Sequence, residues 1–183
     1  MTQLQMATQK KISPEIRQAA MNEQMSAEQM LGKVASGEVV IPHNKNRQAL
    51  PTAIGSKTQT KINANIGTSD LSSDLGREIQ KIELISVYGA HSVMDLSTGK
   101  DLRQIRETLL QNSPLIFGTV PIYAVASLLE SREKSILDFE PEMLFDELEM
   151  QAEQGVDFFT VHAGINRWSL DAIGGRGRKL GIV

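Results

Sequence analysis

The chain has 183 residues, of which 40% are hydrophobic and 22% charged, and its formal net charge is −3. This composition is typical of one globular domain and argues against a dedicated nucleic-acid binder, which usually presents a basic face. The sequence has no cysteine, which excludes disulfides and any thiolate-held zinc or iron–sulfur cluster within these residues. We find no secretory signal and no run of about 20 apolar residues, so we expect a cytoplasmic protein without a membrane partner.

The N-terminal residues 1–59 differ in pattern from the rest of the chain. Two helices, a short strand and a polar, turn-rich stretch are expected over residues 12–24, 25–38, 39–42 and 43–60. Ser13 and Ser26 are placed as helix N-caps, and Pro14 occupies a first helical position where its missing N–H costs nothing. Gly37 is placed as the stop of the second helix. We therefore expect a helical and extended N-terminal segment.

From residue 60 to residue 183 the pattern alternates between strands and helices. Strands are expected at 60–68, 91–98, 114–123 and 157–164, and helices at 73–89, 100–113, 139–155 and 169–181. The strands are apolar on both faces, which is typical of a parallel sheet covered by helices. Pro121 removes a ladder donor, so the third strand must bulge or end there.

Four distinctive side chains recur at regular intervals in this part of the chain. Asn65, Met94 and Tyr123 are spaced 29 residues apart, and His162 follows 39 residues later. One βα unit takes roughly 30 residues, so each side chain is expected at the carboxyl end of a strand, the edge that carries the chemistry in barrels and open α/β sheets. Four such units predict an α/β fold, the first half of a (β/α)8 barrel, whose two open edges need a cover or a partner.

Each of these residues also has an ordinary structural explanation. Asn65, together with Asn63, could cap the turn after its strand. Met94 could simply pack, and the Tyr123 hydroxyl could bond either a structural partner or a ligand. His162 could be a core histidine bonded to a backbone carbonyl, or a group that exchanges protons with a substrate. The residue pattern alone leaves these alternatives open.

The stretch MDLSTGKD, residues 94–101, places Asp95, Ser97 and Gly99 between a strand and a helix. Such a turn can bind an anion through backbone N–H groups at the start of the helix. It can equally serve as an ordinary cap for the helix that opens near Asp101. The glycine spacing is not that of a Walker motif.

Five stretches resemble phosphomethylpyrimidine synthases, in the same order and at matching intervals. They are VVIPHNKNR (39–47), KINANIGTS (61–69), VMDLSTGKD (93–101), NSPLIFGTVPIY (112–123) and EQGVDFFTVHAG (153–164). The resemblance implies a radical S-adenosylmethionine lyase of thiamine biosynthesis with a (β/α)8 barrel. Such an enzyme converts 5-aminoimidazole ribotide into 4-amino-5-hydroxymethyl-2-methylpyrimidine phosphate. The resemblance further implies that Asn65, Met94, Tyr123 and His162 contact the ribotide and that none of them generates the radical.

The resemblance also implies machinery that these residues do not contain. In the family, a phosphate-binding segment, metal-binding histidines for which zinc is a candidate, and a three-cysteine motif for a [4Fe–4S] cluster occur at higher residue numbers. We therefore expect an N-terminal fragment that holds no metal and is inactive by itself. The full-length protein is expected to be a homodimer that uses S-adenosylmethionine and the cluster.

Two departures from the family pattern leave the product open. The family often has glutamine after TVPIY, where this chain has Ala124, and residues 165–179 replace a more apolar stretch. A sister family, 5-hydroxybenzimidazole synthase, uses the same substrate and cofactor in anaerobic cobamide biosynthesis. A non-catalytic half-barrel and a generic phosphate-binding half-barrel are further alternatives.

Overall fold

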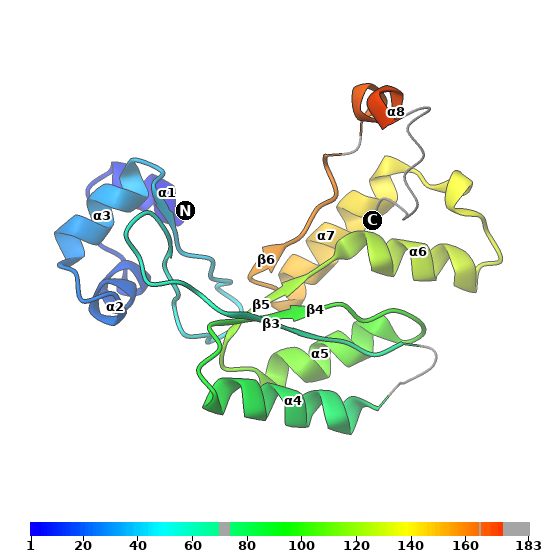
Figure 1. Cartoon of the computed structure of the whole chain (residues 1–183), viewed down its shortest axis with the longest axis horizontal. Helices are drawn as coiled ribbons and strands as arrows, with labels where there is room; N and C mark the ends of the chain where they lie inside the picture. The colour runs from blue at the N-terminus through cyan, green and yellow to red at the C-terminus, as the bar shows by residue number, and fades with distance from the viewer. Residues whose placement is uncertain (70–73, 165, 174–183) are drawn as a thin grey trace.

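The computed structural model describes residues 1–69, 74–164 and 166–173 (Figure 1). At its centre is a parallel sheet with the order β3 (Asn63–Ile66), β4 (Ser92–Asp95), β5 (Ile116–Thr119) and β6 (Phe158–Phe159). The helices of this part are α4 (Leu75–Val87), α5 (Leu102–Asn112), α6 (Pro121–Ser131), α7 (Pro141–Gln154) and α8 (Arg167–Ile173), with a 3-10 helix, η1 (Ile136–Asp138). The predicted α/β class with a parallel sheet is confirmed.

The N-terminal segment contains α1 (Gln3–Thr8), α2 (Pro14–Asn22), α3 (Ala27–Ala35) and the antiparallel pair β1 (Val39–Val40) and β2 (Ile54–Gly55). Its helices lie beyond one end of the sheet (Figure 1). Ser13 and Ser26 cap α2 and α3 as predicted, with their hydroxyl groups 3.0 and 3.1 Å from backbone N–H nitrogens. Gly37 follows α3 with a positive φ of 76°. The six-residue helix α1 was not predicted, because it is too short to show a period.

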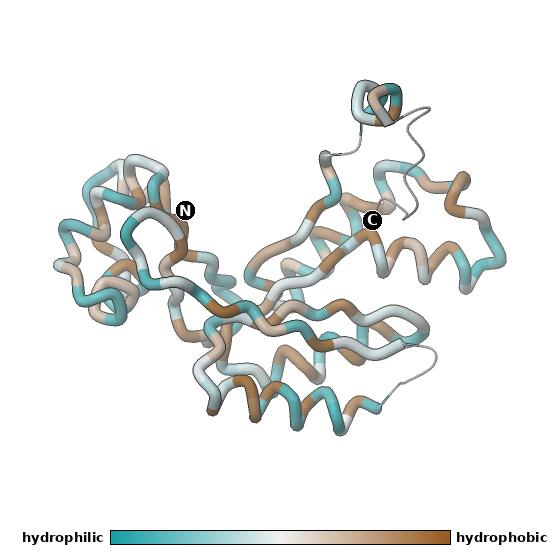
Figure 2. Tube along the Cα trace, in the orientation of Figure 1, coloured by the Kyte–Doolittle hydropathy of each residue, from teal (hydrophilic) through white to brown (hydrophobic). Residues whose placement is uncertain are grey.

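Two separate hydrophobic cores hold these parts together. The first packs α1, α2 and α3 against β1 through fully buried residues such as Ile16, Met30 and Val39. The second lies between the sheet and the helices α4 and α5, around Ile82 and Phe117. Figure 2 shows hydrophobic and hydrophilic residues alternating along α4, as expected of a helix with one buried face. The division into units at residues 1–59 and 60–183 stays a prediction.

Two strands are shorter than predicted. The strand expected at 114–123 ends at Thr119, and Pro121 begins α6. Proline is well suited to a first helical position because its missing N–H would have no helical partner there. Of the strand expected at 157–164, only Phe158 and Phe159 pair with β5. The chain from Thr160 onward leaves the sheet and is exposed, so the predicted buried strand around His162 is wrong.

A buried ion pair joins the N-terminal segment to the sheet. Arg47 Nη2 lies 3.0 Å from Asp157 Oδ2, and both side chains are almost fully buried. Asp157 also accepts the Asn44 backbone N–H at 2.8 Å, while Arg47 donates to the carbonyl oxygens of Leu110 and Ser113 at 3.0 and 2.8 Å. The stretch HNKNR therefore fastens the loop before β2 to the start of β6 and to the end of α5.

The last predicted helix, at 169–181, is described only as far as residue 173, where α8 ends, and its remaining residues lie outside the described part. None of the described helices is long and apolar enough to cross a membrane.

Candidate functional site

The candidate residues of β3 and β4 share one face of the sheet. Successive side chains of a strand point to opposite faces, and Ile66 and Val93 point into the core with α4 and α5. Asn65 and Met94 therefore lie on the face away from these helices. They are direct partners in the parallel register of the two strands. The sheet thus places two of the four predicted residues next to each other.

Asn65 is exposed and does not cap a turn. Its Oδ1 accepts a long hydrogen bond from Asn63 Nδ2 at 3.4 Å, and Asn63 Oδ1 accepts the Ser92 hydroxyl at 2.7 Å. The two asparagine side chains thus bond along and across the strands, and the turn-capping explanation is wrong for both. Within the described residues, Asn65 Nδ2 donates no hydrogen bond, so it is available to a ligand.

Met94 is buried beside the exit of β6. The Thr160 hydroxyl donates to Met94 Sδ at 3.7 Å. The next residue of the same row is Gly118, which pairs with both Met94 and Phe158. A Cβ on Gly118 would lie 2.3 Å from the Phe158 ring, so this ring covers the glycine directly. The glycine therefore allows β6 to approach the face on which Met94 lies.

Tyr123 and His162 contact each other through their rings. Tyr123 lies in the first turn of α6, and His162 lies in the exposed segment after β6. Their ring centroids are 6.1 Å apart, with 33° between the ring planes. Because His162 is exposed, the explanation as a core histidine is wrong. The Tyr123 hydroxyl makes no hydrogen bond within the described residues.

The structure therefore brings the four predicted residues together as two pairs. Asn65 and Met94 are joined by strand register, and Tyr123 and His162 by ring contact. Thr160, which bonds Met94, precedes His162 by two residues and connects the pairs along the chain. An amide, a thioether, a phenol and an imidazole can orient a planar heterocycle through hydrogen bonds and ring contact.

The turn after β4 uses its polar side chains internally. Asp95 Oδ1 accepts both the backbone N–H and the hydroxyl of Ser97, at 2.9 and 2.5 Å. The Ser97 hydroxyl oxygen in turn accepts the Thr68 backbone N–H at 3.0 Å. Asp101 precedes α5 with a left-handed φ of 56° and makes no side-chain cap. The capping explanation is therefore wrong for Asp101.

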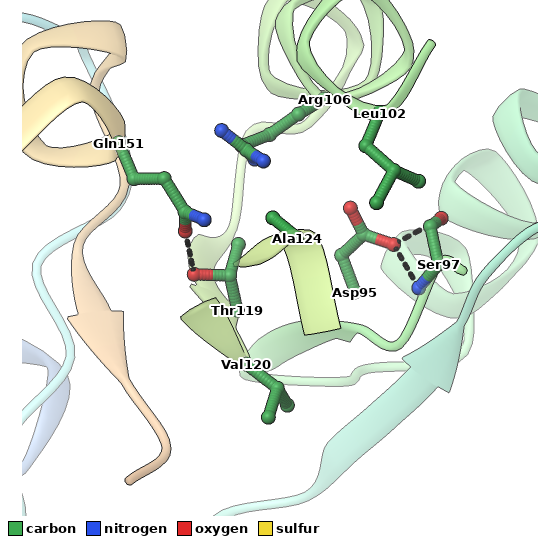
Figure 3. A pocket seen from close by; sticks show the side chains of 8 residues that line it. All are labelled: Asp95, Ser97, Leu102, Arg106, Thr119, Val120, Ala124 and Gln151. Atoms are coloured by element: carbon green, nitrogen blue, oxygen red, sulfur yellow. Dashed lines mark hydrogen bonds between the residues drawn. The ribbon is translucent and has the colours of Figure 1, made fainter. Parts of the chain in front are cut away.

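A small polar cavity of about 10 Å³ lies behind these strand ends. Figure 3 shows its lining, formed by Asp95, Ser97, Leu102, Arg106, Thr119, Val120, Ala124 and Gln151. Burial raises the pKa of the Asp95 carboxyl, against the opposing effects of the Ser97 hydrogen bonds and the Arg106 charge. Burial also lowers the pKa of Arg106, which Glu147 opposes. Two opposite charges are thus held in a nearly dry space.

Arg106 is the main residue of this region that sequence reasoning missed. Its guanidinium donates to Gln154 Oε1 at 2.6 Å and to Glu147 Oε1 at 3.0 Å, both from α7. Arg106 follows Leu102 by four residues and so lies on the apolar face of α5. A charge on an apolar helix face is the signal that could have identified it.

The residues present do not fit a thiolate-ligated cluster. The sequence contains no cysteine. Within the described ranges, no group of three or more histidine, aspartate or glutamate side chains is arranged to hold a metal ion. No step is therefore derived through an iron–sulfur cluster or a metal bound by these residues.

Comparison with known proteins identifies the family. The sequence model of the Radical SAM ThiC family matches residues 2–183. The chain belongs to this family. It is 42% identical to phosphomethylpyrimidine synthase 1 of Methanosphaera stadtmanae, and 39% and 41% identical to the phosphomethylpyrimidine synthases of Methanococcus maripaludis and Desulfitobacterium hafniense. Each match covers the whole chain but 43% of the relative, so this Radical SAM ThiC chain spans less than half of their length.

Proposed function

We propose that this Radical SAM ThiC chain supplies substrate-binding residues to an enzyme that converts 5-aminoimidazole ribotide into 4-amino-5-hydroxymethyl-2-methylpyrimidine phosphate for thiamine. The relatives' names support the reaction, since each is called a phosphomethylpyrimidine synthase. The observation that carries the binding role is the contact of Tyr123 with His162 at 6.1 Å beside the Asn65–Met94 pair.

The four residues have complementary roles in this proposal. Asn65 donates through its free Nδ2 to an acceptor of the ribotide, and Met94 forms an apolar wall. Tyr123 and His162 offer a hydroxyl and ring nitrogens that bond no described residue. None of the four is an activated nucleophile, so they bind and orient the substrate.

The radical chemistry needs groups outside this sequence. Bound S-adenosylmethionine with a [4Fe–4S] cluster supplies a substrate radical in this type of enzyme, and zinc is the candidate second metal. Because residues 1–183 contain no cysteine, we propose that the cluster is held by cysteines elsewhere and that these residues alone do not turn over.

The architecture of the complete enzyme forms part of the same proposal. β3 and β6 are the outer strands of the four-stranded sheet. Unpaired edges invite further strands, which supports a (β/α)8 barrel completed by four more βα units. We further propose that residues 1–59 and 60–183 are separate units and that the enzyme is a cytoplasmic homodimer.

A second candidate is 5-hydroxybenzimidazole formation from the same ribotide. Ala124 favours it, because this residue departs from the family's frequent glutamine and lines the cavity next to Asp95. A change of side-chain volume close to the substrate residues could redirect a radical rearrangement.

The deciding experiment uses the product of the complete reading frame that contains residues 1–183. The protein is reconstituted anaerobically with iron and sulfide, then incubated with S-adenosylmethionine, a reductant and the ribotide, and the products are identified by mass spectrometry. Formation of the pyrimidine phosphate supports the proposal, and 5-hydroxybenzimidazole supports the second candidate. A protein that neither binds the ribotide nor forms either product would be a non-catalytic module.

A further inference from the structure

We propose that Asp95 and Ser97 are positioning residues, which lock together the turns that follow β3 and β4 and thereby fix Asn65 and Met94 for the substrate. This inference rests on the proposed function, because it assigns a role relative to the ribotide. Asp95 lies on the opposite face of β4 from Met94, next to α5, so it acts through the backbone and not through contact with the ligand.

The first step is the carboxylate of Asp95. Its side chain belongs to a residue that is only 6% exposed, and its Oδ1 receives two donors from Ser97, at 2.9 Å from the backbone nitrogen and 2.5 Å from the hydroxyl oxygen. Hydrogen bonds to an ionised acceptor are shorter and roughly twice as strong as neutral ones. The carboxylate therefore fixes both the backbone and the side chain of Ser97.

The second step is the Ser97 hydroxyl, which reaches the neighbouring turn. Because its proton is given to Asp95, its oxygen is free to accept the Thr68 N–H at 3.0 Å. The Thr98 N–H donates back to the Thr68 carbonyl at 2.9 Å. Two consecutive residues of the β4 turn thus hold one residue of the β3 turn.

The third step is the close approach of the two turns at Gly67. Its φ is 153°, and a Cβ there would lie 2.8 Å from the Leu96 carbonyl carbon and from the Ser97 nitrogen. Its N–H is held by Glu78 Oε2 at 2.9 Å. The turns are therefore packed backbone against backbone, and neither can shift without moving the other.

The consequence for the site follows from chain distance. Met94 directly precedes Asp95, and Asn65 precedes Gly67 by two residues in the strand paired with it. A misplacement of about 1 Å at a site can cost roughly 100-fold in rate. The carboxylate faces two charged groups, the Arg106 guanidinium of α5 and the Glu78 carboxylate of α4, which influence its charge in opposite directions.

The test uses the product of the complete reading frame with the variants Asp95→Asn and Ser97→Ala. Asp101→Asn is the matched control, because Asp101 is exposed, belongs to the same loop and makes no side-chain cap. Ribotide affinity is measured by calorimetry. The Met94 methyl group is followed by NMR after ¹³C-methionine labelling, with Met94→Leu to assign the signal.

We expect the ribotide Kd to rise at least about tenfold in each test variant, together with a shift of the Met94 signal, and to stay within about twofold in Asp101→Asn. The double variant should be no weaker than the weaker single variant, because both residues act along one path. Ser97→Thr, which keeps a hydroxyl, should retain affinity that the similarly shaped Ser97→Val loses. This pair also decides the point if Ser97→Ala does not fold.

Several outcomes would overturn the inference. Wild-type Kd in Asp95→Asn and Ser97→Ala is one, and a raised Kd with an unmoved Met94 signal is another. If the wild-type protein does not bind the ribotide, the proposed function fails. The Met94 signal, which needs no ligand, then decides the positioning role separately: shifts in both test variants but not in Asp101→Asn support it, and unchanged signals refute it.

Discussion

Arg47 and Asp157 are 110 residues apart in the sequence and form a buried ion pair, with Arg47 Nη2 at 3.0 Å from Asp157 Oδ2. Asp157 Oδ2 also accepts the Phe117 backbone N–H at 2.8 Å, so the pair lies at the start of both β5 and β6. Removing one member of a buried pair leaves the other charge without compensation. The pair is therefore a stability determinant outside the candidate site.

Arg47→Ala is expected to lower the free energy of unfolding by about 3–5 kcal/mol, since it strands the buried Asp157 carboxylate. Urea unfolding followed by circular dichroism measures the change. The control is Arg77→Ala, which breaks an exposed pair with Asp74 at 3.5 Å and should cost less than about 1 kcal/mol. Equal losses in both variants would contradict this assignment.

Gly118→Ala should destabilise the sheet by about 1–3 kcal/mol, because the added methyl group overlaps the Phe158 ring. Gly32→Ala, in α3, meets no atom within 4 Å and should instead stabilise by about 0.5–1 kcal/mol. The melting temperatures of the two variants should therefore move in opposite directions. A Gly118→Ala protein as stable as wild type would mean that the ring does not cover the glycine.

Tyr123→Phe and His162→Asn should each weaken ribotide binding about 3- to 10-fold in the complete protein, the loss expected for one neutral hydrogen bond. Both should leave the melting temperature unchanged, because neither polar group bonds a described residue. Tyr88→Phe is the matched control, with a tyrosine that is 83% exposed at the end of α4. Loss of stability without loss of affinity would give Tyr123 and His162 a structural role only.

Asp95→Asn should change the pH dependence of stability. Burial raises the folded pKa of Asp95, so the proton-linked stabilisation is present below the unfolded pKa of about 3.9 and is lost as pH rises through the folded value. Asparagine has no such titration. The unfolding free energy of the variant relative to wild type should therefore become more favourable between pH 4 and pH 7.

Urea unfolding at pH 4, 5.5 and 7 measures this difference. Asp101→Asn should give a difference from wild type that does not vary with pH, since that carboxylate is exposed. A relative stability of Asp95→Asn that falls as pH rises would show that the folded pKa of Asp95 is not raised.

Local signals explain which elements could be predicted from the sequence. The serine caps and the proline located α2 and α3, and regular intervals placed Asn65 and Met94 at neighbouring strands. The helix α6 was missed because an apolar run without a polar period can be either a buried strand or a buried helix. Only Pro121 marked the boundary between the two.

Features that depend on distant contacts were not accessible in this way. The letters around His162 are apolar, yet burial depends on which other parts of the chain cover them, and the segment is exposed. The partners of Arg106 are 41 and 48 residues away on α7, so no local pattern identifies them. The ring contact between Tyr123 and His162 likewise joins two segments that the strand pattern had treated separately.

The Arg47–Asp157 pair also has a consequence for how freely this chain can be mutated. Besides the carboxylate, Arg47 donates only to main-chain carbonyl oxygens, those of Leu110, Ser113 and Leu115. Main-chain acceptors are present whatever the side chain, so substitutions at these three positions do not remove the contact. The tolerance of the two positions is opposite: almost any change at 47 or 157 breaks the link, and a mutational scan should find these two among the least replaceable residues far from the substrate.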